Sequence, residues 1–328
     1  MPATLIETKN LCTYFPITKG FLRRKVGEVK AVDEINLSIQ KGETFGLVGE
    51  SGCGKSTLGR TILQLIKATS GEISFNGIDI IHLNASQKRK MRQDLQIIFQ
   101  DPYASLNPRM LVGDIISEPL KIQFPTMSPM EISKRVHEML EMVGLPESCI
   151  SRYPHEFSGG QRQRICISRA MILRPQFLVL DEPVSALDVS VRSQVLNLLM
   201  DLQRELHLTY LFISHDLSVV KHISDRVGVM YLGRIVEIAS KTELYQNPLH
   251  PYTKALLSAI PLPETDKQPK RIILSGDVPS PSNPPEGCRF RARCQEICGK
   301  CMEIRSKNLT LVEVAPGHWV DCVKVTNY

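Results

Sequence analysis

Gly49-Glu-Ser-Gly-Cys-Gly-Lys-Ser56 has the spacing G-x4-G-K-S, and strand and helix patterns flank it on either side. Before it, Glu43–Val48 is an apolar run typical of a buried strand. After it, Lys55–Lys67 carries leucine and isoleucine at helical spacing. A strand, a glycine-rich loop and a helix in this order form the context in which the spacing binds nucleotide phosphates. The stretch therefore predicts a phosphate-binding loop in an α/β domain.

The glycines of this loop allow backbone N–H groups to curl around phosphate oxygens, while the following helix directs its positive end toward them. We expect Lys55 to reach the β- and γ-phosphates and Ser56 to ligate Mg²⁺. Thr57 is placed to contact the α-phosphate. The nucleotide-binding residues predicted here are Gly49, Ser51, Gly52, Cys53, Gly54, Lys55, Ser56 and Thr57.

Short apolar strands continue to alternate with helices along the chain. Besides those above, strands are expected at 34–40, 177–180 and 210–213, and helices at 130–143, 160–173 and 189–206. A hairpin with its turn at Leu232 and Gly233 is expected over 226–239. This alternation predicts parallel strands joined by right-handed helical crossovers.

The strand pattern Phe177-Leu-Val-Leu-Asp181 is followed by a second carboxylate, Glu182. Successive side chains diverge at a strand end, so Asp181 can hold the Mg²⁺ shell while Glu182 polarises an attacking water. Acidic residues also end strands for structural reasons, so the pair indicates a nucleotide site only in combination with the phosphate loop.

Phe157-Ser158-Gly159-Gly160-Gln161 resembles the signature sequence of ABC-type ATPases. Gln100, the segment Ser185-Ala-Leu-Asp188 and His215 match that family's Q-loop, D-loop and switch histidine, in the family's order. The resemblance implies that Gln100 contacts Mg²⁺ and, with Glu182 and His215, serves catalysis. It also implies a head-to-tail dimer, in which Ser158, Gly159, Gly160 and Gln161 contact the ATP held by the neighbouring subunit.

The family stacks adenine on an aromatic residue upstream of the phosphate loop, and Tyr14 and Phe15 stand at the end of the first expected strand. Alignment of the lead-in Asn10-Leu11 favours Phe15, although the insert Pro16–Val29 lengthens this segment. Either ring could instead belong to the core.

Three further phrases are similar to the ATPases of bacterial oligopeptide and dipeptide importers: 100–108, 181–188 and 250–259. The Val184-Ser185 pair resembles the second of the two ATPases in such importers. The resemblance implies ATP and Mg²⁺ as cofactors, and as partners a second ATPase, two membrane permeases and, indirectly, an extracytoplasmic peptide-binding protein. Nickel and glutathione importers share the subfamily and remain alternatives.

Composition and charge narrow the classes of protein to which this chain can belong. A hydrophobic fraction of 42% and a charged fraction of 23% are ordinary for a globular, soluble protein. No apolar run is long enough to span a bilayer, and Met1–Asn10 lacks a signal peptide, so we expect a peripheral protein on the cytoplasmic face of the membrane. The net charge of +6 is dispersed, and its clusters at 23–25 and 88–90 lack interleaved aromatics. This disfavours the different class, ABC ATPases that act on nucleic acid or the ribosome.

Five of the nine cysteines lie in the last 41 residues, beyond the proline-dense stretch 261–285. We expect an ATPase domain at 1–260, an extended linker at 261–286 and a small cysteine-rich domain at 287–328, remote from the phosphate loop. Thiols this dense in a reduced chain predict a metal centre, either tetrahedral zinc or a 4Fe-4S cluster. The spacing resembles the tail of the importer ATPases, which implies the ligands Cys288, Cys294, Cys301 and Cys322, leaves Cys298 extra and favours the cluster. His318 is the alternative ligand for zinc.

Overall fold

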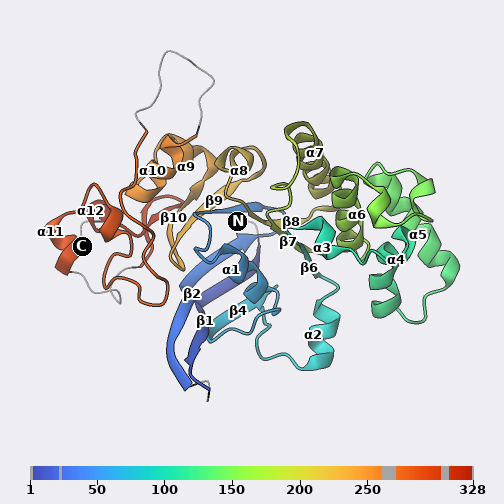
Figure 1. Cartoon of the computed structure of the whole chain (residues 1–328), viewed down its shortest axis with the longest axis horizontal. Coiled ribbons are helices and arrows are strands. Elements are labelled where there is room, and N and C mark those ends of the chain that lie inside the picture. Colours follow the sequence, from blue (N-terminus) through green and yellow to red (C-terminus); the bar gives the residue numbers. More distant parts are fainter. Residues whose placement is uncertain (1–2, 22–23, 261–270, 304–309, 327–328) are drawn as a thin grey trace, which may run out of the picture. The chain divides into compact units, whose positions relative to one another are not determined.

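The computed structural model describes residues 3–21, 24–260, 271–303 and 310–326, and it divides into two compact units. The first unit comprises Met1–Ile39, Glu43–Ile81 and Ser214–Tyr328. The second comprises Gln40–Gly42 and His82–Ile213. The phosphate loop and both ends of the chain therefore belong to the first unit (Figure 1).

The first unit contains an antiparallel sheet that precedes and follows the phosphate loop in sequence. Its strand order is β2-β1-β4-β5, and Figure 1 labels the first three of these strands. Their bounds are β1 Thr4–Lys19, β2 Arg24–Gln40, β4 Ser70–Phe75 and β5 Ile78–Asp79. Buried residues gather toward the amino end of β1 and the carboxyl end of β2, where Ile35, Leu37 and Ile39 alternate with more exposed positions. This is the pattern of a sheet with one face in the core.

A second set of strands in the first unit carries the phosphate loop. β3 pairs in parallel with β9, while β10 pairs antiparallel with β9 and β12, and β12 with β11. Their bounds are β3 Thr44–Val48, β9 Arg226–Tyr231, β10 Arg234–Ser240, β11 Val312–Ala315 and β12 His318–Val320. The cysteine-bearing end of the chain thus joins the sheet of the loop by strand pairing.

The helices of the first unit are short. Their bounds are α1 Lys55–Ile62, α8 Leu217–Ile223, α9 Lys241–Gln246, α10 Pro251–Ser258, α11 Gly299–Glu303 and α12 Val323–Thr326, with a 3-10 turn at Arg291–Arg293. Residues 271–286, the described part of the expected linker, form neither helix nor strand; 261–270 lie outside the described residues.

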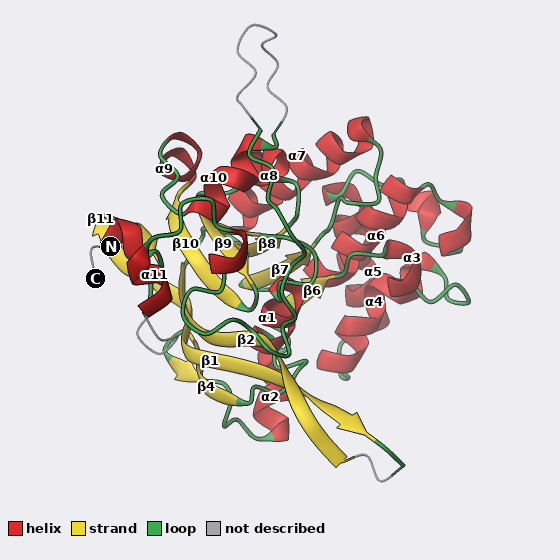
Figure 2. Ribbon diagram, turned by 60° about the vertical axis from the view of Figure 1, so that its left-hand side comes forward, coloured by secondary structure: helices red, strands yellow, loops and turns green. Residues whose placement is uncertain are grey.

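The second unit combines parallel strands with a group of packed helices. β7 pairs in parallel with both β6 and β8. Helices α4, α5 and α6 pack against one another (Figure 2). The bounds are α2 Ala85–Met91, β6 Leu95–Ile98, α3 Pro102–Ser105, α4 Val112–Gln123, α5 Pro129–Met142, α6 Gly159–Met171, β7 Phe177–Asp181, α7 Val189–Leu206 and β8 Thr209–Ile213, with 3-10 turns at Glu147–Cys149 and Pro154–Glu156.

The parallel pairs confirm the α/β prediction, and three of the predicted elements need correction. β2 begins at Arg24 rather than Glu34. α1 ends at Ile62 rather than Lys67, because Leu63 caps it and Gln64 takes a left-handed φ of 56°. β1 does not end at Tyr14 and Phe15 but continues to Lys19. The described part of the insert Pro16–Val29 therefore belongs to β1, β2 and the turn after Lys19.

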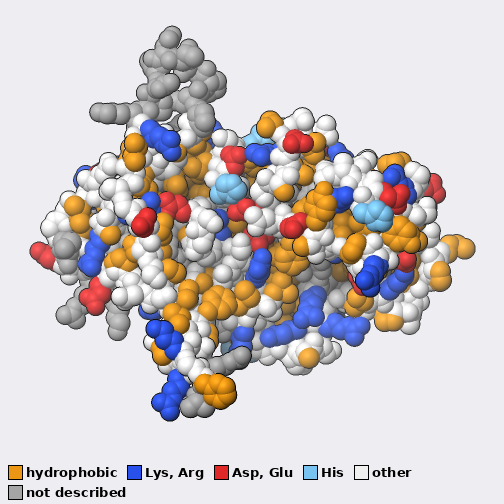
Figure 3. All heavy atoms as spheres, in the orientation of Figure 1, with side chains coloured by type: hydrophobic (Ala, Val, Ile, Leu, Met, Phe, Trp, Pro, Cys, Tyr) orange, Lys and Arg blue, Asp and Glu red, His pale blue; other side chains and the backbone are white. Residues whose placement is uncertain are grey.

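The second basic cluster lies on α2, where Lys88, Arg89 and Lys90 occupy the last turn. Arg89 and Lys90 are exposed, and blue side chains gather over this helix in Figure 3. The guanidinium of Arg89 donates to the carbonyl of Ile122, 2.8 Å away, in the same unit. The cluster is thus a largely solvated surface, and this contact ties it to α4. Among the described residues, no helix has the length and apolar character needed to cross a membrane.

Candidate nucleotide site

The phosphate loop of the first unit depends on glycines that no other residue could replace. Gly54 has a φ of 110° and caps the amino end of α1. A Cβ at this position would lie 2.0 Å from the carbonyl oxygen of Ala31, and one at Gly49 would lie 2.1 Å from that of Met230. Because both positions also have left-handed φ values, the loop can close only with glycine there.

Lys55 begins α1 and is 5% exposed. Its ammonium donates to the carbonyls of Gly49 and Glu50, at 2.8 and 2.9 Å, and lies 3.7 Å from Cys53 Sγ. A buried ammonium needs such acceptors, and phosphate oxygens are stronger ones than neutral carbonyls. The side chain is therefore held at the loop with its charge available to an anion. Burial raises the pKa of Cys53, so that thiol stays neutral beside it.

The other predicted loop residues surround the amino end of α1. Ser56 and Thr57 occupy its first turn and are half-buried, while Ser51 and Gly52 are exposed. The backbone N–H of Leu58 bonds to Gly54 at 2.9 Å, so the first N–H groups of the helix stay unused within it. These N–H groups and the helix dipole provide the anion-binding geometry expected from the sequence.

In the second unit, the end of β7 presents the paired carboxylates. Asp181 is 1% exposed and is the last residue of the strand. Glu182 has a φ of 50°, and its N–H donates to the carbonyl of Ile213 at 3.0 Å. Since the chain turns sharply at Glu182, its side chain diverges from that of Asp181, as the two roles require.

Gln100 and Glu182 meet although 82 residues separate them. The amide Nε2 of Gln100 donates to Glu182 Oε2 at 2.9 Å. Only Phe99 separates Gln100 from the end of β6, and the parallel pairing of β6 with β7 brings the two strand ends together. The structure thus places two of the three predicted catalytic side chains in direct contact.

His215, the third, follows β8 and belongs to the first unit. Its side chain is exposed, and Asp216 caps the amino end of α8 directly behind it, with its carboxylate accepting from Ser218 at 2.9 Å. This cap fixes the backbone conformation directly after His215. Lys55 and His215 thus lie in one unit, and Gln100, Asp181 and Glu182 in the other.

The signature residues form the amino end of α6. Ser158 and Gln161 make a capping box: Gln161 accepts from the N–H of Ser158 at 3.0 Å, and Ser158 Oγ accepts from that of Gln161 at 3.4 Å. Gly159 has room for a Cβ, whereas one at Gly160 would lie 2.3 Å from Val191 in α7. The exposed Ser158 and Gln161 and the half-buried Gly159 thus form an open helix end, while Asp188 stands exposed before α7.

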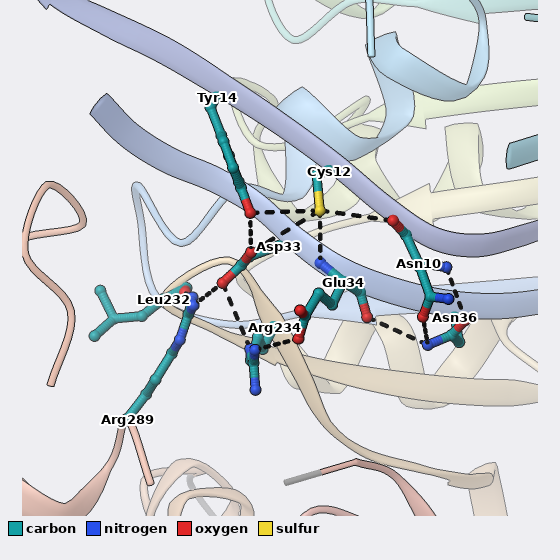
Figure 4. A network of polar contacts seen from close by, with 9 residues as sticks. All are labelled: Asn10, Cys12, Tyr14, Asp33, Glu34, Asn36, Leu232, Arg234 and Arg289. Carbon is teal, nitrogen blue, oxygen red and sulfur yellow. Dashed lines mark hydrogen bonds and ion pairs between the residues drawn. The ribbon is translucent and has the colours of Figure 1, made fainter. Parts of the chain in front are cut away.

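The two candidate aromatics lie on opposite faces of β1. Tyr14 donates its hydroxyl to the carboxylate of Asp33 (Figure 4). Phe15 is 39% exposed and shares its face with Thr13, whose hydroxyl hydrogen-bonds that of Thr61 in α1 at 3.0 Å. Phe15 is thus on the side of the helix that follows the phosphate loop, whereas Tyr14 is engaged in a polar network.

Four cysteines line one cavity of the first unit, which we call the cysteine cavity: Cys288, Cys294, Cys301 and Cys322. Cys298 is outside that lining, with its Sγ 3.2 Å from that of Cys301. Burial raises the pKa of Cys288 to about 12. In the described part of the chain, no group of three or more His, Cys, Asp or Glu is placed to hold a metal ion.

His318, the alternative zinc ligand, has another partner. Its Nε2 lies 2.8 Å from Glu237 Oε1, and both side chains are buried. The same carboxylate accepts from the N–H groups of Leu249 and His250, at 2.8 and 3.0 Å. His318 therefore fixes the start of α10 and does not face the cysteine cavity.

Several supporting residues were not predicted from the sequence. Arg162, 7% exposed, donates to the carbonyls of Pro154 and His155, at 2.7 and 3.1 Å, and so holds the turn before the signature. Glu50 in the phosphate loop bonds to Tyr252 and Arg293. These partners are distant in sequence from the motifs they support, and no local pattern marks them.

The geometry agrees with comparisons to known proteins. Residues 32–185 match the family model described as ABC transporter, and residues 236–301 match that described as oligopeptide/dipeptide transporter, C-terminal region. The oligopeptide transport ATP-binding protein AppF of Bacillus subtilis is 54% identical over 97% of both chains. OppF of Salmonella typhimurium, with the same description, is 51% identical over 98% of this chain and 96% of its own.

Solved structures give the same result for the fold. A dimeric ATP-binding cassette in a post-hydrolysis state, bound to ADP and Pi, aligns with a TM-score of 0.64 and 28% identity, covering 72% of this chain and 99% of its own. The predicted ABC-type fold is thereby confirmed. With its phosphate loop, carboxylate pair and signature, and with relatives above 50% identity along almost its whole length, the chain belongs to the oligopeptide transport ATP-binding proteins of the ABC transporters.

Proposed function

We propose that this chain binds and hydrolyses ATP to drive import of di- or oligopeptides through a membrane transporter. The match of residues 236–301 to the oligopeptide/dipeptide C-terminal region carries the substrate assignment, since the phosphate loop itself is common to many ATPases. The contact of Gln100 with Glu182 supports hydrolysis rather than binding alone. Nothing in the described surface favours a nucleic-acid partner over a transporter.

The proposed chemistry divides between the two units. Ammonium Nζ of Lys55 exchanges its carbonyl acceptors for β- and γ-phosphate oxygens, while the N–H groups of residues 49–57 bind the remaining oxygens. Ser56 and Asp181 are the residues suited to hold Mg²⁺, with Gln100 as a further ligand. The ion would neutralise charge on the phosphates during transfer.

Glu182 is the proposed general base. Its carboxylate accepts the hydrogen bond from Gln100, which orients the group that would take the proton of the attacking water. His215 is proposed to hold the γ-phosphate beside that water. Phe15 is the proposed adenine platform, supported by its exposure and by the engagement of Tyr14 with Asp33.

We further propose that two such ATPases act head to tail. The open amino end of α6 would contact the ATP of the partner ATPase through Ser158, Gly159, Gly160 and Gln161. Asp188 would lie near the same interface between the two ATPases. The other proposed partners are two permeases, reached through the segment 100–110, most of which is exposed, and an extracytoplasmic peptide-binding protein. This assembly would hold the chain at the cytoplasmic face of the membrane.

The transporter assignment predicts that ATP hydrolysis responds to peptide. With its co-encoded partners in lipid vesicles, the chain should hydrolyse ATP several-fold faster when the peptide-loaded binding protein is added, and labelled peptide should accumulate. ATP replaced by a non-hydrolysable analogue is the matched control and should abolish accumulation. Stimulation by nickel or glutathione instead of peptide would reassign the substrate. Stimulation only by nucleic acid or ribosomes would refute transport altogether.

We also propose that residues 287–328 form a metal-binding module after a proline-rich linker at 261–286. Support comes from Cys288, Cys294, Cys301 and Cys322, which line one cavity and offer four soft donors. Their side chains would have to converge further on binding. The donor set fits a 4Fe-4S cluster, with zinc as the alternative, and the module would act structurally or in redox regulation.

The cluster assignment predicts a brown protein after anaerobic purification, absorbing at roughly 400 nm, with iron and sulfide in equal amounts. Cys301→Ser should lose most of the iron, because it removes a buried ligand from the cavity. Cys298→Ser is the control and should retain it, because Cys298 lies outside the lining. A colourless protein with one zinc would refute the cluster; equal iron loss in both variants would refute the ligand set.

A further inference from the structure

The carboxylate of Glu50, the second residue of the phosphate loop, is held by an arginine 243 residues away. Nη1 and Nη2 of Arg293 donate to its two oxygens, at 2.8 and 3.1 Å. The Arg293 side chain is 8% exposed. These hydrogen bonds raise the pKa of Arg293, so its guanidinium stays charged. A two-pronged, largely buried pair of this kind fixes orientation as well as position.

The backbone of Glu50 is held on two further sides. Its N–H donates to the hydroxyl of Tyr252 at 2.9 Å, and its carbonyl accepts from Lys55 Nζ at 2.9 Å. Glu50 thus links the ammonium of the phosphate loop to Arg293 through a single residue. Any shift of Arg293 acts on the carbonyl that positions Lys55.

Arg293 belongs to a segment, 288–294, that is fixed against the same unit. The ring of Phe290 is 2% exposed and lies 5.3 Å from the rings of both Tyr231 and Tyr252. Arg289 donates to the carbonyl of Leu232 and to the carboxylate of Asp33 (Figure 4). The segment cannot move as a whole without breaking an aromatic cluster and a buried ion pair.

Asp33 connects this segment to the strands beside the phosphate loop. Burial would raise the pKa of Asp33, but the hydrogen bond from Tyr14 and the charges of Arg289 and Arg234 outweigh it and lower that pKa. The carboxylate is therefore ionised and paired. Figure 4 shows Tyr14, Asp33 and Arg289 in one chain of contacts. The network joins β1 and β2 to the cysteine-bearing segment, in addition to the Arg293 contact.

We propose that Arg293 is a positioning residue of the nucleotide site, which orients Lys55 through Glu50 and makes ATP affinity depend on the conformation of residues 288–294. Two cavity-lining cysteines, Cys288 and Cys294, stand at the two ends of this segment. A change at the cysteine cavity therefore reaches the phosphate loop through adjacent residues. The inference rests on the proposed nucleotide site and does not require that a metal be bound.

The test is the ATP affinity of the full chain, measured by equilibrium binding at fixed Mg²⁺. Arg293→Gln and Glu50→Gln should each weaken ATP binding about tenfold, within the usual range of coupling between sites. The double variant should bind no more weakly than either single one, because both remove the same pair. Arg293→Lys should fall between wild type and Arg293→Gln. Arg271→Gln, which changes an exposed arginine of the same unit outside the segment, is the control and should match wild type.

A measurement on the unchanged chain covers the case in which a variant misfolds. Coupling is reciprocal, so ATP should slow hydrogen exchange of the amides in 288–294. Full additivity of the two variants, or wild-type affinity in both, overturns the inference, as does unchanged exchange. Lys55→Ala separates this failure from that of the site. If Lys55→Ala binds poorly while Arg293→Gln binds normally, only the inference is wrong; if both bind normally, the nucleotide site itself is misassigned.

Discussion

Glu182→Gln is expected to bind ATP normally and to hydrolyse it about 100-fold more slowly or worse, which is the loss typical of a positioned general base. The amide keeps the shape of the side chain and can still bond to Gln100, but it cannot accept the proton of the attacking water. The variant should therefore accumulate as a closed, ATP-bound dimer. Phosphate release in a single turnover and dimer formation by light scattering measure the two effects.

Glu205→Gln provides the matched control for this substitution. Glu205 is an exposed carboxylate near the end of α7, so the same chemical change there should leave the rate at the wild-type level. A wild-type rate in Glu182→Gln would remove Glu182 from the mechanism. A loss of ATP binding in that variant would show that the carboxylate contributes to affinity instead of to the chemical step.

Lys55→Ala should act on affinity, weakening ATP binding about 10- to 100-fold, as expected for loss of charge-assisted hydrogen bonds. The ammonium is almost fully buried, and its removal deletes the charge that faces the phosphates. It also leaves the carbonyls of Gly49 and Glu50 without this donor. Equilibrium dialysis with labelled ATP measures the change directly.

Lys67→Ala is the control. Lys67 is exposed beyond the end of α1, and its substitution removes the same net charge as Lys55→Ala does. Binding in that variant should equal wild type. Unchanged affinity in Lys55→Ala would contradict the phosphate role of Lys55. Equal losses in both variants would indicate a general charge effect on the anionic ligand.

The sequence predicted the elements whose pattern is local and strong. Val189–Leu206 has the predicted bounds, and the strand at 177–181 differs by one residue, because helical periodicity in the first and an unbroken apolar run in the second are strong local signals. The hairpin turn at Leu232 and Gly233 was predicted because a glycine separates two strand-like apolar runs, and in the structure both residues take left-handed φ values, 43° and 80°. The phosphate loop was recognisable because the spacing of its glycines, lysine and serine follows directly from the loop conformation that binds phosphate.

Other features had no such local signal. The helix Val112–Gln123 contains Pro119, a residue that ordinarily ends helices, yet buried Ile115, Ile116 and Leu120 hold it against α6. The cysteine-bearing segment was expected to be remote from the phosphate loop, and that expectation was wrong, since Arg293 reaches Glu50. An ion pair between residues so far apart in sequence depends on the fold, which composition and periodicity do not encode.

The hairpin turn at Leu232 and Gly233 has a consequence for exchanging parts between related ATPases. Gly233 donates its N–H to the carbonyl of Cys53 and accepts from that of Asp33, while the carbonyl of Leu232 accepts from Arg289. One turn thus satisfies backbone groups of the phosphate loop and of β2, and it binds an arginine side chain from the carboxyl-terminal part of the chain. A chimaera that receives a foreign carboxyl-terminal segment would inherit arginines fitted to a different loop. Such a chimaera also needs the donor protein's residues at positions 33 and 50, because the carboxylates there pair with Arg289 and Arg293.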